Sequence, residues 1–433
     1  MSISRKAVLS ALLALGAAFA APAADAGTSI NLGDVAVTVT GSPCQLYKLS
    51  AVDGSIIWGP VSAVGPDCTI AVDQRDLSVY VGNGSHINGN PGTLTKYNSS
   101  GGFSWSNNVP GATSGGCTGA YYVSSIAVDT TSASPGVVPS EQGCFGYVNK
   151  NSTSTGANIW ATSTNDLLQS ALDPANGQIY SISVNGHNQM YSVTAAGAPT
   201  STGWTPEGGQ GPEMNPVDRA LYYASGSTLY QMSTTTLGTS NWTMSLGAVT
   251  GLGNLAVQPW KGGFDYLVDN GGSKIIVVNP AKQTIVRTFA TSLTPQFSAV
   301  NPLGGAIYIS SNTANFVQAV DHYGTVIWTS PNLGAHVISI AAPRNTVGAP
   351  NPPLPAGCAS GFNVSKSTWN SDFTTIMGAV GNLPTTLTGN TCIVIRDTST
   401  YNEQVFVTSF TNAGYHLTIE ADPSFTSSAP VIS

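Results

Sequence analysis

Residues 299–309 of the chain read AVNPLGGAIYI, and residues 324–328 read GTVIW. The first stretch contains a short apolar strand that ends at Asn301, and Tyr308 follows seven residues later in an alternating strand. In the second stretch, Gly324 stands four residues before Trp328. Glycine permits the positive φ angle that a tight hairpin turn needs, and a tryptophan beyond such a turn can bury its ring against a neighbouring sheet. This order of signals predicts a unit of four short antiparallel strands.

The pattern recurs with a period slightly above 40 residues. The anchor residues, each at the end of an apolar run, are Asp73, Asp129, Asp173, Asn215, Gln258, Asn301 and Ala342, at intervals of 56, 44, 42, 43, 43 and 41. A tyrosine follows five anchors after seven or eight residues, at Tyr80, Tyr180, Tyr222, Tyr266 and Tyr308. In the second unit we assign this position to Tyr147, 18 residues beyond the anchor, and infer an insertion. Strand-rich units of this length are typical of β-propeller blades.

A large aromatic residue stands late in each unit, at Trp58, Trp105, Trp160, Trp204, Trp242, Phe289 and Trp328. Six complete units extend from about residue 66 to residue 332, and the two leftover segments complement each other. Residues 336–342 form an inner strand with nothing after it, whereas residues 35–60 contain three later strands with no inner strand before them. Joining them closes the ring and removes its open edges. The expected fold is therefore all-β, a seven-bladed β-propeller whose closing blade comes from both ends of the domain. Six or eight blades are the alternatives.

Residues 46–58, LYKLSAVDGSIIW, resemble the outer strands of quinoprotein-like (PQQ-repeat-like) propeller repeats, in which an apolar strand is followed by an Asp-x-x-x-Gly type of turn and a Trp. Residues 229–232 and 320–328 fit the same pattern, so that the resemblance covers about residues 30–345. For the quinone-dependent dehydrogenases of this group, the resemblance implies a Ca²⁺ held by acidic and amide side chains, a nearby Asp base and often vicinal cysteines. This sequence has no Cys-Cys pair and few acidic residues. A quinone-type oxidoreductase is therefore kept only as an alternative.

The composition excludes several classes of protein. Only 8% of the 433 residues are charged, against ~25% in average proteins, and Gly (48 residues), Ser, Thr and Asn take their place. Because these residues favour strands and turns over helices, a helical bundle is excluded. The net charge is −7 with only 14 Lys and Arg, which leaves no basic surface for phosphates and argues against nucleic-acid binding.

The N-terminal residues predict export. Arg5 and Lys6 precede an apolar stretch at residues 7–20, and Ala24-Asp25-Ala26 is a small-residue cleavage motif, so residues 1–26 are interpreted as a signal peptide. No later segment is long and apolar enough for a transmembrane helix.

The six cysteines also fit an exported chain. An even number of cysteines behind a signal peptide predicts disulfides, for which fifteen pairings exist. The most local pairing is Cys44–Cys68, Cys117–Cys144 and Cys358–Cys392. No metal site is predicted, because CxxC motifs are absent and the five histidines are scattered.

The sequence changes in character after the propeller, which we assign to residues 27–345. Residues 346–358 form a Pro-rich linker, and a second domain occupies residues 359–433. There, residues 371–384 predict a short amphipathic helix, with Phe373, Ile376, Val380 and Leu383 on one face. Strands are expected at residues 392–397, 403–407, 415–421 and 430–432.

This order of a helix and strands resembles the N-terminal cap and first coil of a right-handed parallel β-helix of bacterial surface proteins. Residues 400–405, TYNEQV, resemble an element at the start of such domains. Because a single coil leaves a stacking face exposed, we interpret the domain as truncated, with docking on another chain as the alternative.

No catalytic residue is assigned. Pectin-modifying enzymes share the β-helix resemblance, which implies a truncated polysaccharide lyase or esterase as a further alternative. Glu403 and Arg396 are the nearest charged pair, and we interpret them as a polar rim. The sequence contains no Gly-x-Ser-x-Gly elbow and no Walker or dinucleotide motif.

The candidate ligand site is the central face of the propeller, where the loops after the inner strands converge. The polar anchors predicted there are Asp73, Asp129, Asp173, Asn215 and Asn301, together with Gln258. A ring of carboxylates and amides suits a calcium ion or a glycan, and Trp260 and Tyr323 are candidates for stacking on a sugar. The alternative is that each anchor side chain caps the turn that follows it, as Asp and Asn commonly do.

We therefore expect a secreted, periplasmic or cell-surface protein whose role is binding, adhesion or scaffolding and not catalysis. The expected partner is an extracellular glycan or protein. No cofactor is predicted, and a calcium ion is the alternative.

Overall fold

The computed structural model describes residues 34–63, 65, 68–83, 92–109, 122–129, 135–142, 146–164, 167–183, 189–203, 209–216, 218–259, 265–302, 306–320, 324–343, 354, 357–366, 372–395, 399–407, 410–421 and 430–432. Several predicted features lie outside the described residues: the signal peptide, most of the Pro-rich linker, Cys117, Cys144, Trp204, Trp260, Tyr323 and Arg396.

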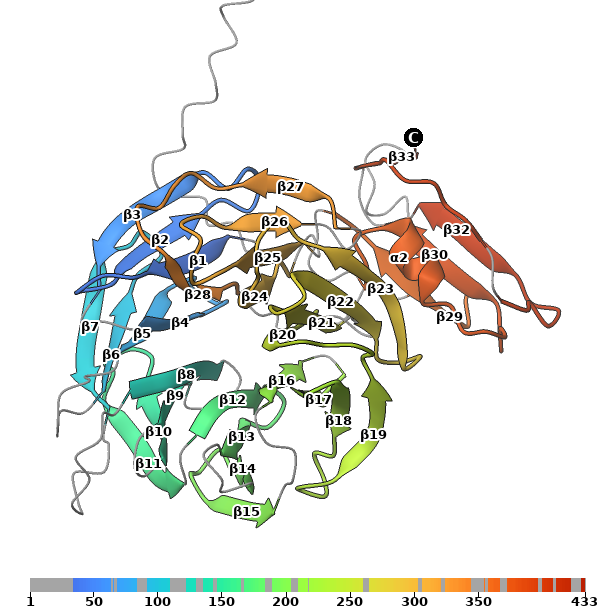
Figure 1. Cartoon of the computed structure of the whole chain (residues 1–433). Coiled ribbons are helices and arrows are strands. Elements are labelled where there is room, and N and C mark those ends of the chain that lie inside the picture. Colours follow the sequence, from blue (N-terminus) through green and yellow to red (C-terminus); the bar gives the residue numbers. More distant parts are fainter. Residues whose placement is uncertain are drawn as a thin grey trace, which may run out of the picture. The chain divides into compact units, whose positions relative to one another are not determined.

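Seven four-stranded antiparallel sheets, called blades 1 to 7 below, surround a central axis in the described part of the chain (Figure 1). Blade 2 contains β4 (Cys68–Val72), β5 (Val79–Asn83), β6 (Thr93–Tyr97) and β7 (Phe103–Asn108). Blade 3 contains β8 (Tyr122–Asp129), β9 (Gly136–Gln142), β10 (Gly146–Ser152) and β11 (Asn158–Thr164). Blade 4 contains β12 (Leu167–Asp173), β13 (Gln178–Ser183), β14 (Gln189–Val193) and β15 (Pro199–Gly203).

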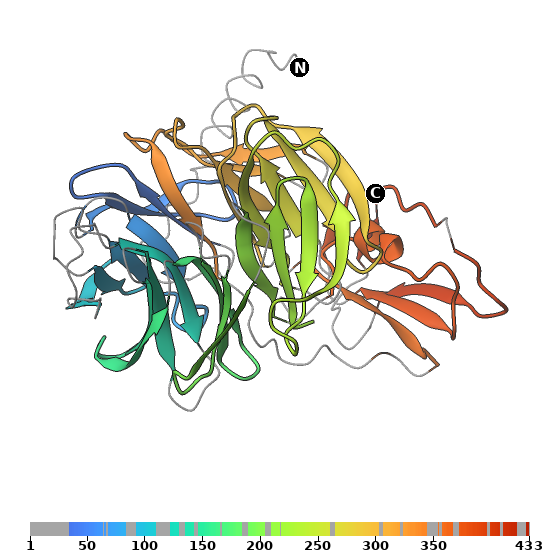
Figure 2. The ribbon, with the colours of Figure 1, turned by 60° about the horizontal axis from the view of Figure 1, so that its bottom comes forward.

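The next three blades repeat this order of strands along the chain. Blade 5 contains β16 (Gln210–Asn215), β17 (Ala220–Ser225), β18 (Thr228–Met232) and β19 (Ser240–Ser245), which lie side by side in the turned view of Figure 2. Blade 6 contains β20 (Leu252–Val257), β21 (Asp265–Asp269), β22 (Lys274–Asn279) and β23 (Thr284–Ala290). Blade 7 contains β24 (Phe297–Val300), β25 (Ile307–Ser310), β26 (Gln318–Val320) and β27 (Val326–Thr329).

Blade 1 is the closing blade and combines both ends of the propeller. Its strands are β28 (Val337–Ala341), β1 (Val35–Val39), β2 (Gln45–Leu49) and β3 (Ile56–Ser62). The antiparallel register between β28 and β1 places Ala36 opposite Ala341 and Val37 opposite Ile340. The prediction of seven blades, with one made from both chain ends, is confirmed.

The late tryptophans connect successive blades. Trp58 of blade 1 donates its indole N–H to the carbonyl of Ser99 in the outer hairpin of blade 2, at 2.8 Å. Trp105 and Trp160 make the same bond to Thr153 of blade 3 and Ala195 of blade 4, at 3.3 and 2.9 Å. Each ring therefore lies against the outer turn of the next blade, as the glycine-and-tryptophan pattern predicted.

The second strands contribute the largest core side chains. Tyr80, Tyr180, Tyr266 and Tyr308 are almost completely buried. In blade 3, however, Tyr147 lies in the third strand, β10, so its assignment to the second strand was wrong. Val138 lies opposite Ala127, as Tyr80 lies opposite Ala71 in blade 2. A smaller apolar residue thus occupies the tyrosine position in blade 3. The 18 residues between Asp129 and Tyr147 need no insertion, because the complete second strand β9 lies between them.

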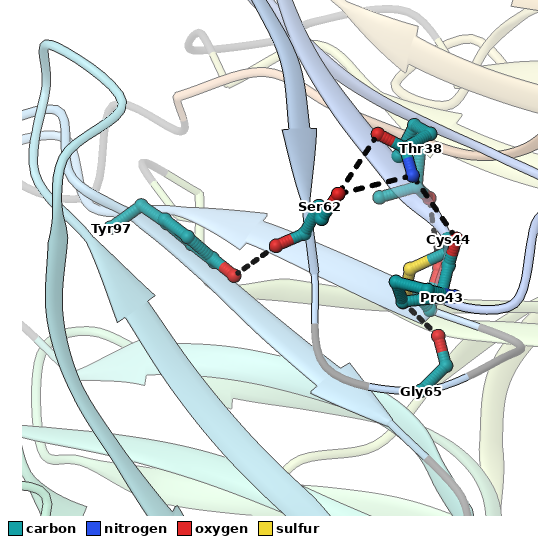
Figure 3. Close-up of a disulfide and its surroundings, with 8 residues drawn as sticks. Thr38, Pro43, Cys44, Ser62, Gly65 and Tyr97 are labelled. Atoms are coloured by element: carbon teal, nitrogen blue, oxygen red, sulfur yellow. Dashed lines mark hydrogen bonds between the residues drawn. A yellow bond between two sulfur atoms is a disulfide. The ribbon is translucent and has the colours of Figure 1, made fainter.

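A disulfide joins Cys44 and Cys68, and therefore links the closing blade to the inner strand of blade 2 (Figure 3). Around it, the amide of Cys44 donates to the carbonyl of Gly65 at 2.8 Å, and the Thr38 hydroxyl donates to the carbonyl of Cys68 at 2.9 Å. Tyr97 donates to the carbonyl of Ser62 at 3.3 Å. The other expected disulfide that falls within the described residues, Cys358–Cys392, is also present.

The C-terminal residues form parallel sheets and one short helix. Strands β29 (Ser360–Val364), β30 (Thr391–Ile395) and β32 (Leu417–Ala421) pair in parallel, and so do β31 (Thr400–Tyr401) and β33 (Val431–Ile432). The helix α2 (Ile376–Gly381) is shorter than expected, but Phe373, Ile376, Val380 and Leu383 are all buried as predicted.

The expected strand at residues 403–407 is absent, because the chain there supports the helix instead. The two carboxylate oxygens of Glu403 accept hydrogen bonds from the backbone amides of Ile376 and Met377, at 2.9 and 2.8 Å. These amides belong to the first helical turn, which has no internal acceptors for them. Among the described residues, no helix is long and apolar enough to span a bilayer.

Candidate functional site

A cavity of about 590 Å³ lies between the inner strands of all seven blades. Its lining comes from β4, β8, β12, β16, β20, β24 and β28, together with residues directly before or after some of these strands. A volume of this size is typical of small-molecule pockets, which span roughly 300–1,000 Å³. The fold therefore concentrates one residue set from every blade around a single concave site.

Polar side chains recur near the start of the inner strands. Six lining residues stand four or five positions before their anchor: Thr69, Ser124, Gln169, Gln210, Asn254 and Gln296. They come from blades 2 to 7 in order. The inner strands all run in the same direction along the axis. Residues near their starts therefore form a ring of hydroxyls and amides at one end of the cavity.

Hydrogen bonds between blades hold part of this ring in place. The side-chain amide nitrogen of Gln169 in blade 4 donates to Glu213 of blade 5 at 3.3 Å. The side-chain oxygen Oε1 of Gln169 accepts from the Gly211 backbone amide at 3.0 Å. Asn254 of blade 6 donates to the carbonyl of Ser298 in blade 7 at 3.0 Å. A ring that is ordered before binding loses less conformational entropy when a ligand arrives.

Two lining hydroxyls have unused hydrogen-bonding capacity. Ser125 and Ser298 lie in β8 and β24, and their side chains are at least nine-tenths buried. Neither Oγ atom has a hydrogen-bond partner in the structure. A buried polar group without a partner costs free energy, so these atoms favour a polar occupant of the cavity.

The described lining contains a single ionisable side chain, that of Glu213. Cys68 also lines the cavity, but its sulfur is in the disulfide. General acid–base and nucleophilic catalysis require titratable groups within reach of one another. The described lining residues therefore provide binding groups without a catalytic pair.

The predicted aspartate anchors lie outside this lining, at the ends of inner strands. Asp73, Asp129 and Asp173 are all fully buried. Asp73 pairs with Arg75 at 2.7 Å, two residues further along its own turn. Asp129 pairs with the buried Lys150 at 2.8 Å.

Asp173 is shared between two blades. Its carboxylate pairs with Arg219 of blade 5 at 2.6 Å, and it also accepts from the backbone amide of Ala175 at 3.0 Å. In the same way, the Asp73 carboxylate accepts from the backbone amide of Arg75 at 2.9 Å. Both side chains therefore cap the turn that follows them, in addition to pairing with arginine.

The amide anchors also engage their own surroundings. Asn215 accepts from the amide of Asp218 at 3.1 Å and donates to the carbonyl of Gln258 in blade 6 at 3.2 Å. The Gln258 side chain donates to the hydroxyl of Tyr266 at 2.7 Å. Asn301 is buried and hydrogen-bonds Tyr308. The five predicted site residues thus lie at equivalent places around the ring without converging on one ligand position.

The donors that the quinoprotein resemblance implies are not assembled by the described lining. That resemblance implies acidic ligands for Ca²⁺ and a separate Asp base, whereas Glu213 is the one carboxylate there. The described residues contain one group with metal-ligand spacing, Cys358, Cys392 and Glu420, and its two cysteines form a disulfide. The described residues therefore fit neither a Ca²⁺-bound quinone in the cavity nor a metal ion at Cys358, Cys392 and Glu420.

Comparisons with known proteins show a likeness in fold to solved structures. No family model and no curated protein matches the sequence. A chain in the crystal structure of a nidogen/laminin complex is similar in fold, with a TM-score of 0.46 and 12% sequence identity, over 71% of this chain and 97% of that chain.

Proposed function

We propose that this chain is an exported, non-catalytic binding protein whose inner-strand cavity takes a neutral, hydroxyl-rich ligand of the glycan class. The observation that supports this most directly is the ring of amides and hydroxyls contributed by successive blades. Amide and hydroxyl groups both donate and accept, which suits the alternating donors and acceptors of sugar hydroxyls. The described lining residues offer a charged ligand a single carboxylate, that of Glu213.

The positions of the two unpartnered hydroxyls indicate how far the ligand extends. Ser125 and Ser298 lie on blades 3 and 7, so a ligand that satisfies both has to extend across the cavity. Gln210 and Gln296 lie on blades 5 and 7 and supply amide groups at the ring described above. A short oligosaccharide offers hydroxyls over such a span, whereas a metal ion offers a single point of attachment.

A binding experiment with matched variants tests the proposal. The wild-type protein is screened against an array of neutral glycans, and the affinity of the best ligand is measured by calorimetry. We expect the double variant Gln210→Ala/Gln296→Ala to lose binding at least tenfold, because it removes two amides from the ring. Asn241→Ala removes an exposed amide from the outer strand β19 and should bind like the wild type. Equal affinities for both variants, or binding of acidic or protein ligands only, would contradict the proposal.

Two finer assignments belong to the same proposal. The cleavage motif at residues 24–26 supports export, with a mature chain that begins at Gly27. The parallel register of β29, β30 and β32 supports the interpretation of the C-terminal residues as the cap and first coil of a β-helix. Sequence determined beyond Ser433 that lacks further strand repeats would contradict the second assignment.

A further inference from the structure

A buried carboxyl–amide pair lies in blade 3, outside the cavity lining. Glu141 of β9 and Asn149 of β10 both have side chains with 0% exposure. Asn149 Nδ2 donates to Glu141 Oε1 at 3.2 Å. The other two polar atoms of the pair, Glu141 Oε2 and Asn149 Oδ1, are buried and have no hydrogen-bond partner.

The two unpartnered atoms are complementary only if a proton lies between them. An ionised carboxylate and an amide carbonyl oxygen are both acceptors, so the ionised pair leaves two buried acceptors without a donor. A proton on Glu141 Oε2 supplies the missing donor for Asn149 Oδ1. The acid and the amide then form a cyclic pair with two hydrogen bonds, O–H to Oδ1 and Nδ2–H to Oε1.

We propose that Glu141 keeps its proton at neutral pH and closes this cyclic pair with Asn149, so that the junction of blades 2 and 3 is tightened by the protonated pair and loosened at alkaline pH. The pair faces blade 2 because Val123, opposite Glu141 in the ladder, packs in one apolar cluster with Leu94 and Tyr80 of that blade. Cross-strand partners project on the same side of a sheet.

The groups packed around Glu141 leave its charge uncompensated. Tyr147 of β10 lies opposite it, and Val123 of β8 on its other side is apolar. From blade 2, Tyr80 of β5 and Leu94 of β6 belong to the apolar cluster that contains Val123, and the ammonium of Lys96 in β6 contacts Asp76 and the carbonyl of Thr153 at 3.1 Å each. Lys150, next to Asn149, points to the opposite side of the sheet and pairs with Asp129.

Burial supports the same protonation state. Loss of solvent raises the pKa of Glu141 from 4.5 to about 8, and the hydrogen bond from Asn149 opposes that rise only in part. The folded protein therefore holds a proton that the unfolded chain releases near its ordinary pKa. The contribution of this group to stability is complete below about pH 4.5, falls as the pH rises toward about 8, and is constant above that value.

Carboxyl ¹³C NMR tests the protonation state in the intact protein. The chain has five glutamates, so labelling their side-chain carboxyl carbons yields five resonances. We expect one of them to titrate near pH 8 and to be missing from the spectrum of Glu141→Gln. If all five titrate in the ordinary acidic range, the proposal is overturned, and this wild-type measurement holds whether or not the variant folds.

The pH dependence of unfolding tests the consequence for the junction. Glu141→Gln retains both hydrogen bonds, because a Gln amide N–H can donate to Asn149 Oδ1, but it has no proton to lose. The variant should therefore show a smaller decline in unfolding midpoint between pH 5 and pH 8 than the wild type shows. Glu420→Gln makes the same chemical change in strand β32, where the side chain is only partly buried, and should retain the wild-type decline. A decline of equal size in Glu141→Gln would overturn the proposal.

Discussion

The indole N–H of Trp328 donates to the carbonyl oxygen of Ala51 at 3.0 Å, although 277 residues separate the two in the chain. Trp328 belongs to the outer strand of blade 7 and Ala51 to the outer hairpin of the closing blade. The contact is therefore the last of the aromatic contacts that connect successive blades, and it joins the C-terminal side of the propeller to its N-terminal side. Its loss should weaken ring closure, to which the β28–β1 ladder of the closing blade also contributes.

Trp328→Phe should destabilise the propeller by about 1–3 kcal/mol, because the variant removes the hydrogen bond and part of a buried ring. Blade 6 carries Phe289 at the equivalent position, so a phenylalanine ring fits this place without an N–H donor. Urea unfolding measures the effect. Asn241→Ala, on the exposed side of blade 5, is the control and should unfold like the wild type. An unchanged midpoint for Trp328→Phe would show that the contact is not needed for closure.

Gly54→Ala should destabilise the same junction for two reasons. Gly54 has φ = 73°, which an alanine adopts only with strain, and a Cβ atom there would overlap the ring of Trp328. Gly226 has φ = 55° with no atom near its Cβ position, so Gly226→Ala carries backbone strain alone. Thermal unfolding of both variants separates the contributions. We expect the larger loss for Gly54→Ala, and equal losses would mean that Trp328 shifts without cost.

Replacing both Cys44 and Cys68 by alanine should lower the free energy of unfolding by roughly 3 kcal/mol. The reason is that the disulfide closes a loop in the unfolded chain and so lowers the conformational entropy of the unfolded state. The two cysteines are 24 residues apart and connect the closing blade to blade 2. Chemical denaturation under non-reducing conditions measures the change. The matching variant without Cys358 and Cys392 leaves the propeller bond intact. The propeller transition should therefore stay at its wild-type midpoint, and a shift in it would contradict this assignment.

Asp265→Asn should stabilise the protein at neutral pH. Asp265 is fully buried, and neither carboxylate oxygen has a hydrogen-bond partner. Burial raises its pKa well above the ordinary value, and the nearby Asp218 and Glu213 carboxylates raise it further. Because the pKa is raised in the folded state, the wild type loses stability as the pH rises above the ordinary range of an aspartate.

An asparagine at position 265 has no proton to lose, so its unfolding midpoint should change less with pH than that of the wild type. Unfolding midpoints measured from pH 4 to pH 8 provide the comparison. Asp53→Asn removes an exposed carboxylate and is the control, for which no such flattening is expected. A steeper pH dependence in Asp265→Asn than in the wild type would contradict the prediction.

The blade pattern could be predicted because its determinants are local. The anchor Asn301, the strand with Tyr308 and the turn at Gly324 lie within a single unit, and each depends on the conformational preferences of a few neighbouring residues. The closing blade followed from the same reasoning, because the two incomplete ends had complementary strands. Tyr147 was misassigned because spacing alone does not identify the strand to which a residue belongs.

The lining of the cavity was missed for a different reason. The anchors were predicted as the site because they recur, but recurring Asp and Asn residues also cap turns, as Asp73 and Asp173 do here. A usable signal was present in the polar residues four or five positions earlier, among them Gln169 and Gln210. Their offset from the anchor alternates between four and five positions, so they recur less regularly than the anchors do.

Local residue preferences along the chain were thus sufficient for most of the strands and turns, since each depends on neighbours within one unit. The repeat and its two incomplete ends gave the number of blades, and the spacing of the cysteines gave the two disulfides that fall within the described residues. Only the folded ring established which polar side chains line the cavity, and which carboxyl groups, Glu141 and Asp265 among them, are buried without a cation. Those properties depend on register shifts within the inner strands, which change the side of the sheet to which a side chain projects. They also depend on contacts between blades from distant parts of the chain. Contacts between blades involve residues from different units, so the pattern within one unit does not determine them.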